Sequence, residues 1–418
     1  MDHPRPVAII GGNRIPFARA GGAYAGKSNK DMLSGALAGL VARYHLAGEV
    51  IEVAAGAVLR HAADTSLTRE ALLDTQLDPA SPGLDVSRAC ATSLDAAGIL
   101  ADRISLGRID AGIAAGVDSA SDIPVEFAVG PVLAKARRAK GVGRAKALLA
   151  LRPRHLAPVL PALAEPRTGL SMGEHQEISN RRWNIERAAQ DELAAASQSR
   201  LAEAWERGFF DDLVTDYAGL DIDENLRDTS EDKLARLAPA FGGTMTAGNS
   251  SGLTDGAASV LLASEDWARE RHLPILARLV DYETGAVDFA GGQEGLLTAP
   301  MMLAPRLLAR HGLTLADMDL VEIHEAFAAT VLMTLTAWED EEWCRSRLGL
   351  PGAFGTVDRD RLNVTGSSIA TGHPFAATGA RILATAAKAL SERGGGRALI
   401  TVCAAGGQGS CALIEAAP

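Results

Sequence analysis

The chain has 418 residues, of which 47% are hydrophobic, so it is long enough for two or three globular domains. Its net charge of −11 and its 4% aromatic content argue against nucleic-acid binding, which needs positive charge and stacking side chains. There is no run of 18 apolar residues, and the first residues lack the pattern of a secretory signal. Four cysteines are too few for a disulfide framework. We therefore expect a soluble cytoplasmic protein with reduced thiols.

Short apolar runs alternate with helical patterns along the chain. The predicted elements are a strand at 7–10, helices at 29–44 and 91–106, a strand at 111–116, a helix at 374–391 and a strand at 398–402. Gly107 and Gly394–Gly396 each separate a helix from the buried strand that follows it. This shared order predicts an α/β protein built from two similar halves.

The stretch between the halves has a different character. Residues 127–164 contain no Asp or Glu, yet eight Lys or Arg residues fall between Lys135 and Arg154. An alanine-rich, charged helix is expected at 185–208. We predict an N-terminal domain at 1–122 completed by 249–276, an inserted loop domain at 123–248, and a C-terminal domain at 277–418.

Cys90 is the first candidate for chemistry. It stands where a β-compatible run turns into the helix at 91–106, and a thiol at a helix N-terminus is favoured as the nucleophilic thiolate. A small buried apolar residue is the alternative interpretation, because cysteine is often that.

Two histidines mark further candidates. Pro374 suits the first turn of a helix, which places His373 at the helix start and within reach of a substrate. His324 and Glu325 are predicted to open the apolar helix at 324–333, and no second histidine follows at the spacing of a zinc site. Taken alone, each histidine favours an ordinary structural interpretation: a capping or surface residue for His373, and a polar residue at a helix start for His324.

Cys403 ends the buried run at 398–403 and enters a glycine-rich turn. Another strand-like run follows at 411–414, whereas a phosphate-binding loop should open a helix. Such a turn between strands lets backbone N–H groups approach a substrate closely. Cys411 is interpreted as a strand core residue, and Cys344 is assigned no role.

Seven motifs in chain order resemble the thiolase family over most of the chain. They are Arg88–Ser93, Ser171–Gly173, Pro239–Phe241, Thr246–Ala258, His324–Phe327, Gly372–Pro374 and Cys403–Gly407. Their combination is most similar to the 3-ketoacyl-CoA thiolases of fatty-acid β-oxidation, and in particular to trifunctional-type β subunits and their bacterial relatives. The resemblance implies two α/β halves stacked as α/β/α/β/α layers, with a loop domain inserted in the first half.

The resemblance also implies the roles of four side chains. Cys90 would attack C3 of a 3-ketoacyl-CoA and become the acyl-enzyme, while His373 would take the thiol proton. Cys403 would protonate the enolate that leaves as acetyl-CoA, and free CoA would then collect the acyl group. His373 and His324 would bind the enolate oxygen, and the N–H groups of Cys90 and Ala405 would bind the tetrahedral oxyanion.

Three more residues match positions that contact the substrate in the family. Ser251 and Met172 correspond to the pantetheine channel, and Phe327 corresponds to a wall of the substrate pocket. The chain departs from the common pattern with His324 in place of asparagine, Ser171 in place of a histidine found in acetoacetyl-CoA enzymes, and Ser367 in place of a glycine.

Three other functions are alternatives for a protein with this fold. They are an acetoacetyl-CoA-forming biosynthetic thiolase, a decarboxylating condensing enzyme, and a non-catalytic acyl-CoA carrier. Cys403 argues against the second, and the presence of all four site residues argues against the third. The resemblance implies acyl-CoA and CoA as ligands with no further cofactor, no metal, and a homodimer or dimer-built tetramer, with a hydratase/dehydrogenase subunit as a candidate partner. Three interpretations of the basic stretch at 135–154 stay open: a solvated surface, a contact with the CoA nucleotide, and a contact with an anionic membrane surface.

Overall fold

The computed structural model describes residues 4–162 and 164–417. Residues 1–3, 163 and 418, which belong to the three predicted domains, lie outside the described residues. Ten strands of the described chain form one sheet, in the order β10-β11-β12-β9-β1-β8-β5-β3-β4 with β2 paired to β8. The two halves of this sheet meet only at a short ladder in which Ala8 and Ile9 pair with Arg278 and Ala277.

The N-terminal half of the sheet lies between α1 and α2 on one face and α3 on the other. Its strands are β1 (Val7–Arg14), β2 (Ala18–Arg19), β3 (Glu52–Ala55), β4 (Gly83–Asp85), β5 (Ala111–Asp118) and β8 (Thr254–Ser264), and its helices are α1 (Asn29–Arg43), α2 (Leu67–Leu73), α3 (Thr92–Ser105) and α9 (Glu265–Glu270). Ser28 caps α1 because its hydroxyl accepts from the Asp31 N–H while the Asp31 carboxylate accepts from the Ser28 N–H. The predicted strand at 7–10 and the predicted helices at 29–44 and 91–106 are therefore confirmed.

The C-terminal half repeats this arrangement. Its strands are β9 (Ala277–Ala286), β10 (Leu320–Ile323), β11 (Arg397–Ala404) and β12 (Gln408–Ala416), and its helices are α10 (Ala299–Arg310), α11 (Ala328–Glu339), α12 (Glu341–Trp343), α13 (Ser368–Thr371) and α14 (Thr378–Arg393). Cys411 is buried in β12, as expected of a strand core residue. Cys344, which also is buried, begins a π-helical turn that ends at Leu348.

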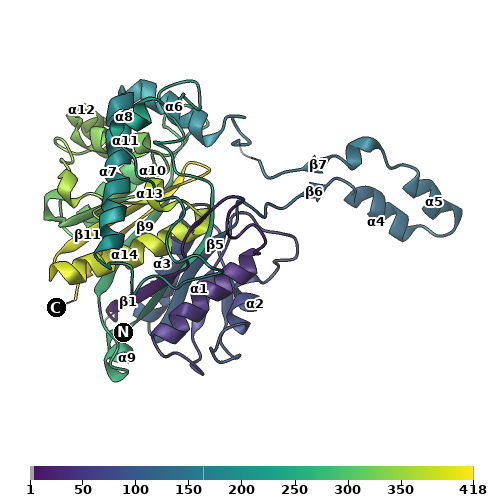
Figure 1. Ribbon diagram of the computed structural model, residues 1–418, viewed down its shortest axis with the longest axis horizontal. Helices are drawn as coiled ribbons and strands as arrows, with labels where there is room; N and C mark the ends of the chain where they lie inside the picture. Colours follow the sequence, from purple (N-terminus) through teal and green to yellow (C-terminus); the bar gives the residue numbers. More distant parts are fainter. Residues whose placement is uncertain (1–3, 163, 418) are drawn as a thin grey trace.

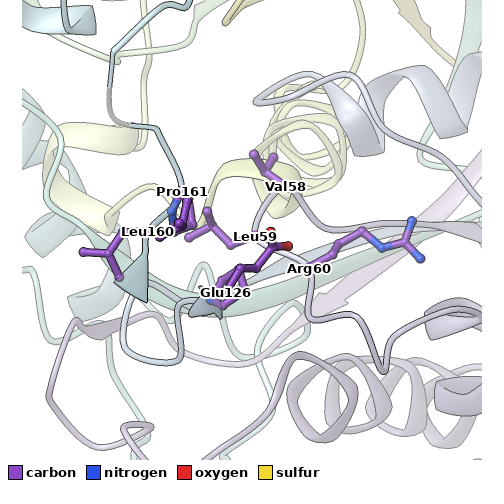
Figure 2. Close-up of a pocket in the computed structure, with 8 residues that line it drawn as sticks. Val58, Leu59, Arg60, Glu126, Leu160 and Pro161 are labelled. Atoms are coloured by element: carbon purple, nitrogen blue, oxygen red, sulfur yellow. The ribbon is translucent and has the colours of Figure 1, made fainter. Parts of the chain in front are cut away.

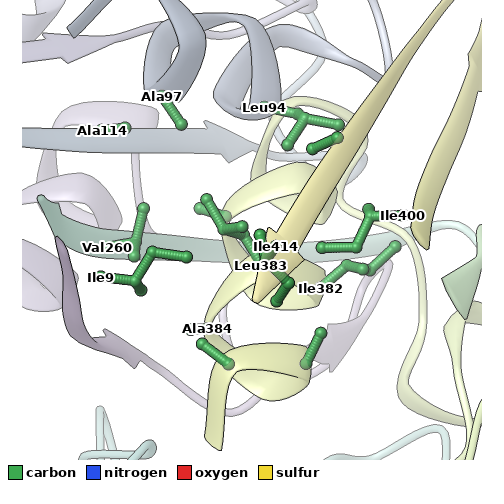
Figure 3. Close-up of a cluster of buried hydrophobic side chains, with 14 of the residues drawn as sticks. Ile9, Leu94, Ala97, Ala114, Val260, Ile382, Leu383, Ala384, Ile400 and Ile414 are labelled. Atoms are coloured by element: carbon green, nitrogen blue, oxygen red, sulfur yellow. The ribbon is translucent and has the colours of Figure 1, made fainter. Parts of the chain in front are cut away.

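Helices α3 and α14 fill the middle of the molecule and contact strands of both halves. Leu94 and Ala97 of α3 pack with Ile382 and Leu383 of α14 between the two parts of the sheet (Figure 3). The helices approach so closely that a Cβ at Gly379 would lie 2.4 Å from the Leu94 nitrogen. With α1 and α2 outside one half and α10 and α11 outside the other, this gives the expected α/β/α/β/α layers.

The segment between β5 and β8 has two parts. One part packs on the body through α6 (Met172–Trp183), α7 (Arg187–Glu206) and α8 (Glu231–Ala235). The other is an arm, defined here as residues 126–159, that projects from the body (Figure 1). The arm contains β6 (Glu126–Phe127), α4 (Gly130–Arg138), α5 (Val142–Leu148) and β7 (Pro158–Val159), and β6 pairs with β7 at its base.

Two predicted helix starts are wrong. Helix α11 begins at Ala328, because residues 324–327 continue as an extended segment in which the His324 N–H donates to the Thr401 carbonyl and Phe327 pairs with Ser250. Helix α14 begins at Thr378, after a 3-10 turn at Phe375–Ala377. In both places tertiary contacts replace the helical turn that the residue types favoured.

Candidate active site

Cys90 lies at the end of a tight loop directly before α3. The preceding Ala89 has a φ of +44°, a left-handed conformation that is rare without glycine, so the loop is held under strain. Thr92 braces this loop by accepting from the Arg88 N–H and donating to the Ala89 carbonyl. The half-buried Cys90 thiol is thereby presented toward the C-terminal half.

The Cys90 sulfur lies 3.1 Å from Nε2 of His373. The backbone fixes His373, since its N–H donates to Thr254 Oγ1 at 2.8 Å, and its Nδ1 lies 2.7 Å from Thr378 Oγ1. Gly372 precedes it with a φ of +99° and packs against the Thr254 side chain, where a Cβ would lie 2.5 Å from that methyl group. With Nδ1 bonded to the Thr378 hydroxyl, Nε2 is the ring nitrogen that faces the thiol of Cys90.

Both members of this pair are neutral at ordinary pH. Burial lowers the pKa of His373 to about 3, with a further contribution from the Arg381 cation. Burial raises the pKa of Cys90 to about 12, with a further contribution from Asp118, although the N–H groups of Ala405 and Cys90 itself act in the opposite direction. Desolvation thus opposes the thiolate form that a position at a helix N-terminus was expected to favour.

Cys403 lies near the end of β11, and its thiol is close enough to Cys90 to be affected by the charge of that thiol. Burial, and next the neighbouring Cys90, raise the pKa of the Cys403 thiol above its usual range. The hairpin turns through Gly406 and Gly407, whose φ values are +76° and +71°, and a Cβ at Gly407 would lie 2.8 Å from the Val287 carbonyl. The strand-to-strand turn predicted from the sequence is confirmed, and it carries the Ala405 N–H to the Cys90 sulfur.

His324 completes the constellation, with its ring centroid 4.2 Å from that of His373. Its Nδ1 lies 2.8 Å from Ser368 Oγ, and its buried Nε2 has no hydrogen-bond partner among the described residues. Burial, then His373 and Arg381, lower the His324 pKa well below its usual range, so this imidazole is neutral as well. The adjacent Glu325 accepts from Ser197, Asn363 and the Ile369 N–H.

A buried carboxylate that the sequence did not single out supports the site. Asp118 at the end of β5 accepts from the N–H groups of Val58 and Leu59 and from the N–H of Ala376 in the turn after His373. Burial raises the pKa of Asp118 to about 7. In the sequence, Asp118 could have been identified as an aspartate close to the end of the buried strand predicted at 111–116.

A hollow of about 260 Å³ adjoins this carboxylate at the base of the arm (Figure 2). Its walls are mostly apolar and come from the loop after β3 and from both ends of the arm. They are Val58, Leu59, Arg60, Pro124, Glu126, Val159, Leu160 and Pro161. Val58 and Leu59 thus line the hollow with their side chains while their N–H groups bind Asp118.

Of the three residues matched to substrate contacts, Met172 and Phe327 belong to one apolar cluster, and Ser251 bonds to the residue before Phe327. Ser251 donates its N–H and its hydroxyl to the Ala326 carbonyl. Phe327 meets the Phe241 ring edge to face at 6.1 Å, and Met172, at the start of α6, packs in the same apolar cluster. Among the described residues no group of three or more His, Cys, Asp or Glu side chains is placed to hold a metal ion, and no helix is long and apolar enough to cross a membrane.

Comparison with known proteins finds relatives that match nearly the whole chain. Residues 7–266 match the thiolase N-terminal domain, and residues 273–416 match the thiolase C-terminal domain. The chain is 41% identical to a 3-ketoacyl-CoA thiolase of Pectobacterium atrosepticum, covering 99% of this chain and 97% of that one, and 40% identical to one of Klebsiella pneumoniae over 98% and 97%.

Solved structures show the same relationship. An acetyl-CoA acetyltransferase of Bacillus anthracis superposes with a TM-score of 0.82 at 29% identity, with both chains fully covered. The human mitochondrial 3-ketoacyl-CoA thiolase superposes with a TM-score of 0.81 at 27% identity over 99% of each chain. The chain belongs to the thiolase family.

Proposed function

We propose that this protein is an acetyl-CoA acyltransferase that cleaves 3-ketoacyl-CoA with CoA, as a thiolase of fatty-acid β-oxidation. The proposal rests on the 3.1 Å contact between Cys90 Sγ and His373 Nε2, with a second buried thiol, Cys403, near Cys90. Its relatives named 3-ketoacyl-CoA thiolase, matched over 96–97% of their length, support the choice of substrate.

In the first half-reaction the Cys90 sulfur attacks C3 of the substrate while its proton passes to Nε2 of His373. The C2–C3 bond then breaks, the acyl group stays on Cys90 as a thioester, and the electron pair leaves on the enolate of acetyl-CoA. Cys403 donates its proton to C2, which releases acetyl-CoA. A neutral thiol beside a neutral imidazole suits this step, because charge forms only as the proton moves.

The second half-reaction restores both thiols. The Cys403 thiolate takes the proton of incoming CoA, whose sulfur attacks the thioester on Cys90. Acyl-CoA leaves, and the Cys90 sulfur recovers its proton from His373. Coenzyme A is a substrate in this scheme, and no further cofactor is invoked.

Negative charge develops on two different oxygens and needs two sites. The N–H groups of Cys90 and Ala405 would bind the tetrahedral oxyanion at C3, which the approach of Ala405 to the Cys90 sulfur supports. His373 and His324 would bind the enolate oxygen. Ser251 and Met172 would line the pantetheine channel and Phe327 a wall of the pocket.

A biosynthetic acetoacetyl-CoA thiolase is the alternative, and the structural similarity to an acetyl-CoA acetyltransferase favours it. Ser171, which caps α6, stands against it because the acetoacetyl-CoA enzymes commonly carry a histidine at the matched position. Comparing kcat/KM for thiolysis of acetoacetyl-CoA with that of 3-ketoacyl-CoA esters of increasing chain length decides between them. Higher values for longer chains are expected, and a preference for acetoacetyl-CoA would select the biosynthetic function.

The partners are proposed with the function. Membership of the thiolase family supports assembly as a homodimer or dimer-built tetramer, and a hydratase/dehydrogenase subunit is a further candidate partner. The four free thiols support a cytoplasmic location. The arm is proposed to touch an anionic membrane surface. Arg137, Arg138 and Lys140 are exposed on it near the exposed apolar side chains of Val142 and Leu149, a combination that favours the lipid interface.

A further inference from the structure

A buried chain of hydrogen bonds runs behind His324, away from the reacting atoms. Nη2 of Arg381 donates to Ser368 Oγ at 2.7 Å, and Ser368 Oγ lies 2.8 Å from Nδ1 of His324. All three side chains are at most 3% exposed. Ser368 comes from α13 and Arg381 from α14, the two helices on either side of His373.

The direction of each bond follows from the chemistry of the groups. A guanidinium can only donate, so Ser368 Oγ accepts from Arg381. The hydroxyl has a single proton, and its one other partner among the described residues is Nδ1 of His324. If Nδ1 carried a proton, the Ser368 hydroxyl would accept twice and leave its own buried proton unbonded, which is unfavourable.

We propose that Ser368 and Arg381 are positioning residues that hold His324 as the Nε2–H tautomer, so that this N–H donates directly to the enolate oxygen of acetyl-CoA. The buried, unpartnered Nε2 is the atom left for that bond. This inference rests on the proposed thiolase function for the identity of the oxygen, whereas the tautomer itself does not depend on it.

The two imidazoles, whose planes are tilted by 45°, thereby acquire opposite roles. Nδ1 of His373 is bonded to the hydroxyl of Thr378, so Nε2 is the ring nitrogen that faces Cys90 and acts as the base in the proposed mechanism. The hydroxyl of Ser368 supplies a proton to Nδ1 of His324, so Nε2 of that ring is a donor. Rings 4.2 Å apart, each beside one hydroxyl, thus give a general base and an oxyanion donor.

Arg381 affects the site through its positive charge as well as by fixing the direction of the hydrogen bond to Ser368. It makes no ion pair within 4.0 Å among the described residues, and its two bonded acceptors are the neutral hydroxyls of Ser367 and Ser368. Burial is the main cause that lowers the pKa of both His324 and His373, and the Arg381 cation adds to it in both rings. The same charge stabilises an enolate oxygen in this low-dielectric site.

Nitrogen-15 NMR of histidine-labelled protein tests the tautomer directly, because protonated and unprotonated ring nitrogens differ widely in chemical shift. The His324 signals are assigned among the nine histidines by their loss in His324→Asn. We expect Nε2 protonated and Nδ1 unprotonated in the unmodified protein. A proton on Nδ1 in the unmodified protein overturns the proposal whether or not any variant folds.

The matched variants are Ser368→Ala and Ser367→Ala, since both remove a hydroxyl bonded to Arg381 but only the first touches His324. Ser368→Ala should release the tautomer and lower kcat for thiolysis by about 100-fold, the usual cost of one oxyanion donor. Ser367→Ala should leave both unchanged, and Ser368→Thr, which keeps the hydroxyl, should restore both.

Acetyl exchange between acetyl-CoA and CoA separates this inference from the proposed function. Exchange uses Cys90 and the backbone oxyanion site but no enolate, so Ser368→Ala should retain it. Equal losses of thiolysis in the Ser368 and Ser367 variants would refute the positioning role. Absence of thiolysis and exchange in the unmodified protein would instead refute the thiolase function while leaving the NMR result to decide the tautomer.

Discussion

The site and the arm are stabilised in opposite ways. Helices α3 and α14 bury 10 and 12 of their residues, whereas α4 and α5 in the arm bury one each, Ala136 and Ala147. The arm helices have nine and seven residues, short of the roughly 12–15 at which an isolated helix becomes even marginally stable. The arm therefore depends on its own helix pair and on the ribbon at its base, while the site depends on contacts across the whole body.

This difference shows that the body of the protein provides the conditions for catalysis and that the arm provides the conditions for surface contact. In the site, burial sets the protonation of every reacting group, because water is excluded by both halves of the chain. In the arm, the charged side chains are exposed to water. Their contribution to binding therefore depends on how many they are and where they lie. Substitutions in the site should act on turnover, and substitutions in the arm should act on association.

Removing the nucleophile should have the largest effect. We expect Cys90→Ala to lower thiolysis by at least about 10⁴-fold, since a covalent mechanism loses its acyl acceptor. Steady-state assay of the purified variant measures this. Cys411→Ala is the matched control, because it removes another buried thiol from the body outside the site, and an equal loss in that control would point to folding rather than chemistry.

Removing the second thiol should separate two parts of the reaction. Cys403→Ala is expected to lower thiolysis and condensation by about 10³-fold, the scale of a general acid. Acetyl exchange through Cys90 should persist, because it requires no proton at C2. Near-normal thiolysis in this variant would remove Cys403 from its role.

The pH dependence of alkylation checks the neutral pair. Cys90 is half-buried while the other three cysteines are buried, so iodoacetamide should modify Cys90 first. Its pKa is raised to about 12, so the thiolate fraction should rise about tenfold per pH unit from pH 6 to pH 9. Peptide mapping after partial modification follows the rate, and a plateau near neutral pH would show a thiolate–imidazolium pair instead.

Changes in the arm should have the smallest effect on turnover. Changing Arg137, Arg138 and Lys140 to Gln should weaken binding to anionic vesicles about 100-fold, at about 1 kcal/mol per basic residue, and leave thiolysis of a water-soluble substrate intact. Vesicle co-sedimentation measures binding. A variant with Arg108, Arg236 and Arg345 changed to Gln is the control, because these side chains are exposed elsewhere. Equal binding by both variants and the unmodified protein would exclude membrane contact by the arm.

Much of the fold follows from local patterns. Apolar runs with glycine breaks indicated both halves, and Gly107 and Gly394 do end α3 and α14 with φ values of +69° and +81°. The helix starts at 324 and 374 were misplaced, because residues there pair with strands and loops far away in the chain. The predicted domain boundaries stay predictions, and the arm was visible in sequence only as a basic stretch without acidic residues.

The sequence by itself determined which side chains are available for the chemistry: two cysteines, two histidines and a glycine-rich turn in motifs that resemble the thiolase family. Only the tertiary structure decided their protonation and direction. Cys90 and His373 are 283 residues apart in the chain. Burial raises the pKa of Cys90 and lowers that of His373, so that both groups are neutral, whereas the position of Cys90 at a helix start favoured the thiolate. The contacts through which Ser368 and Arg381 set the tautomer of His324 join side chains from separate elements. Their geometry cannot be read from the residue types along the chain.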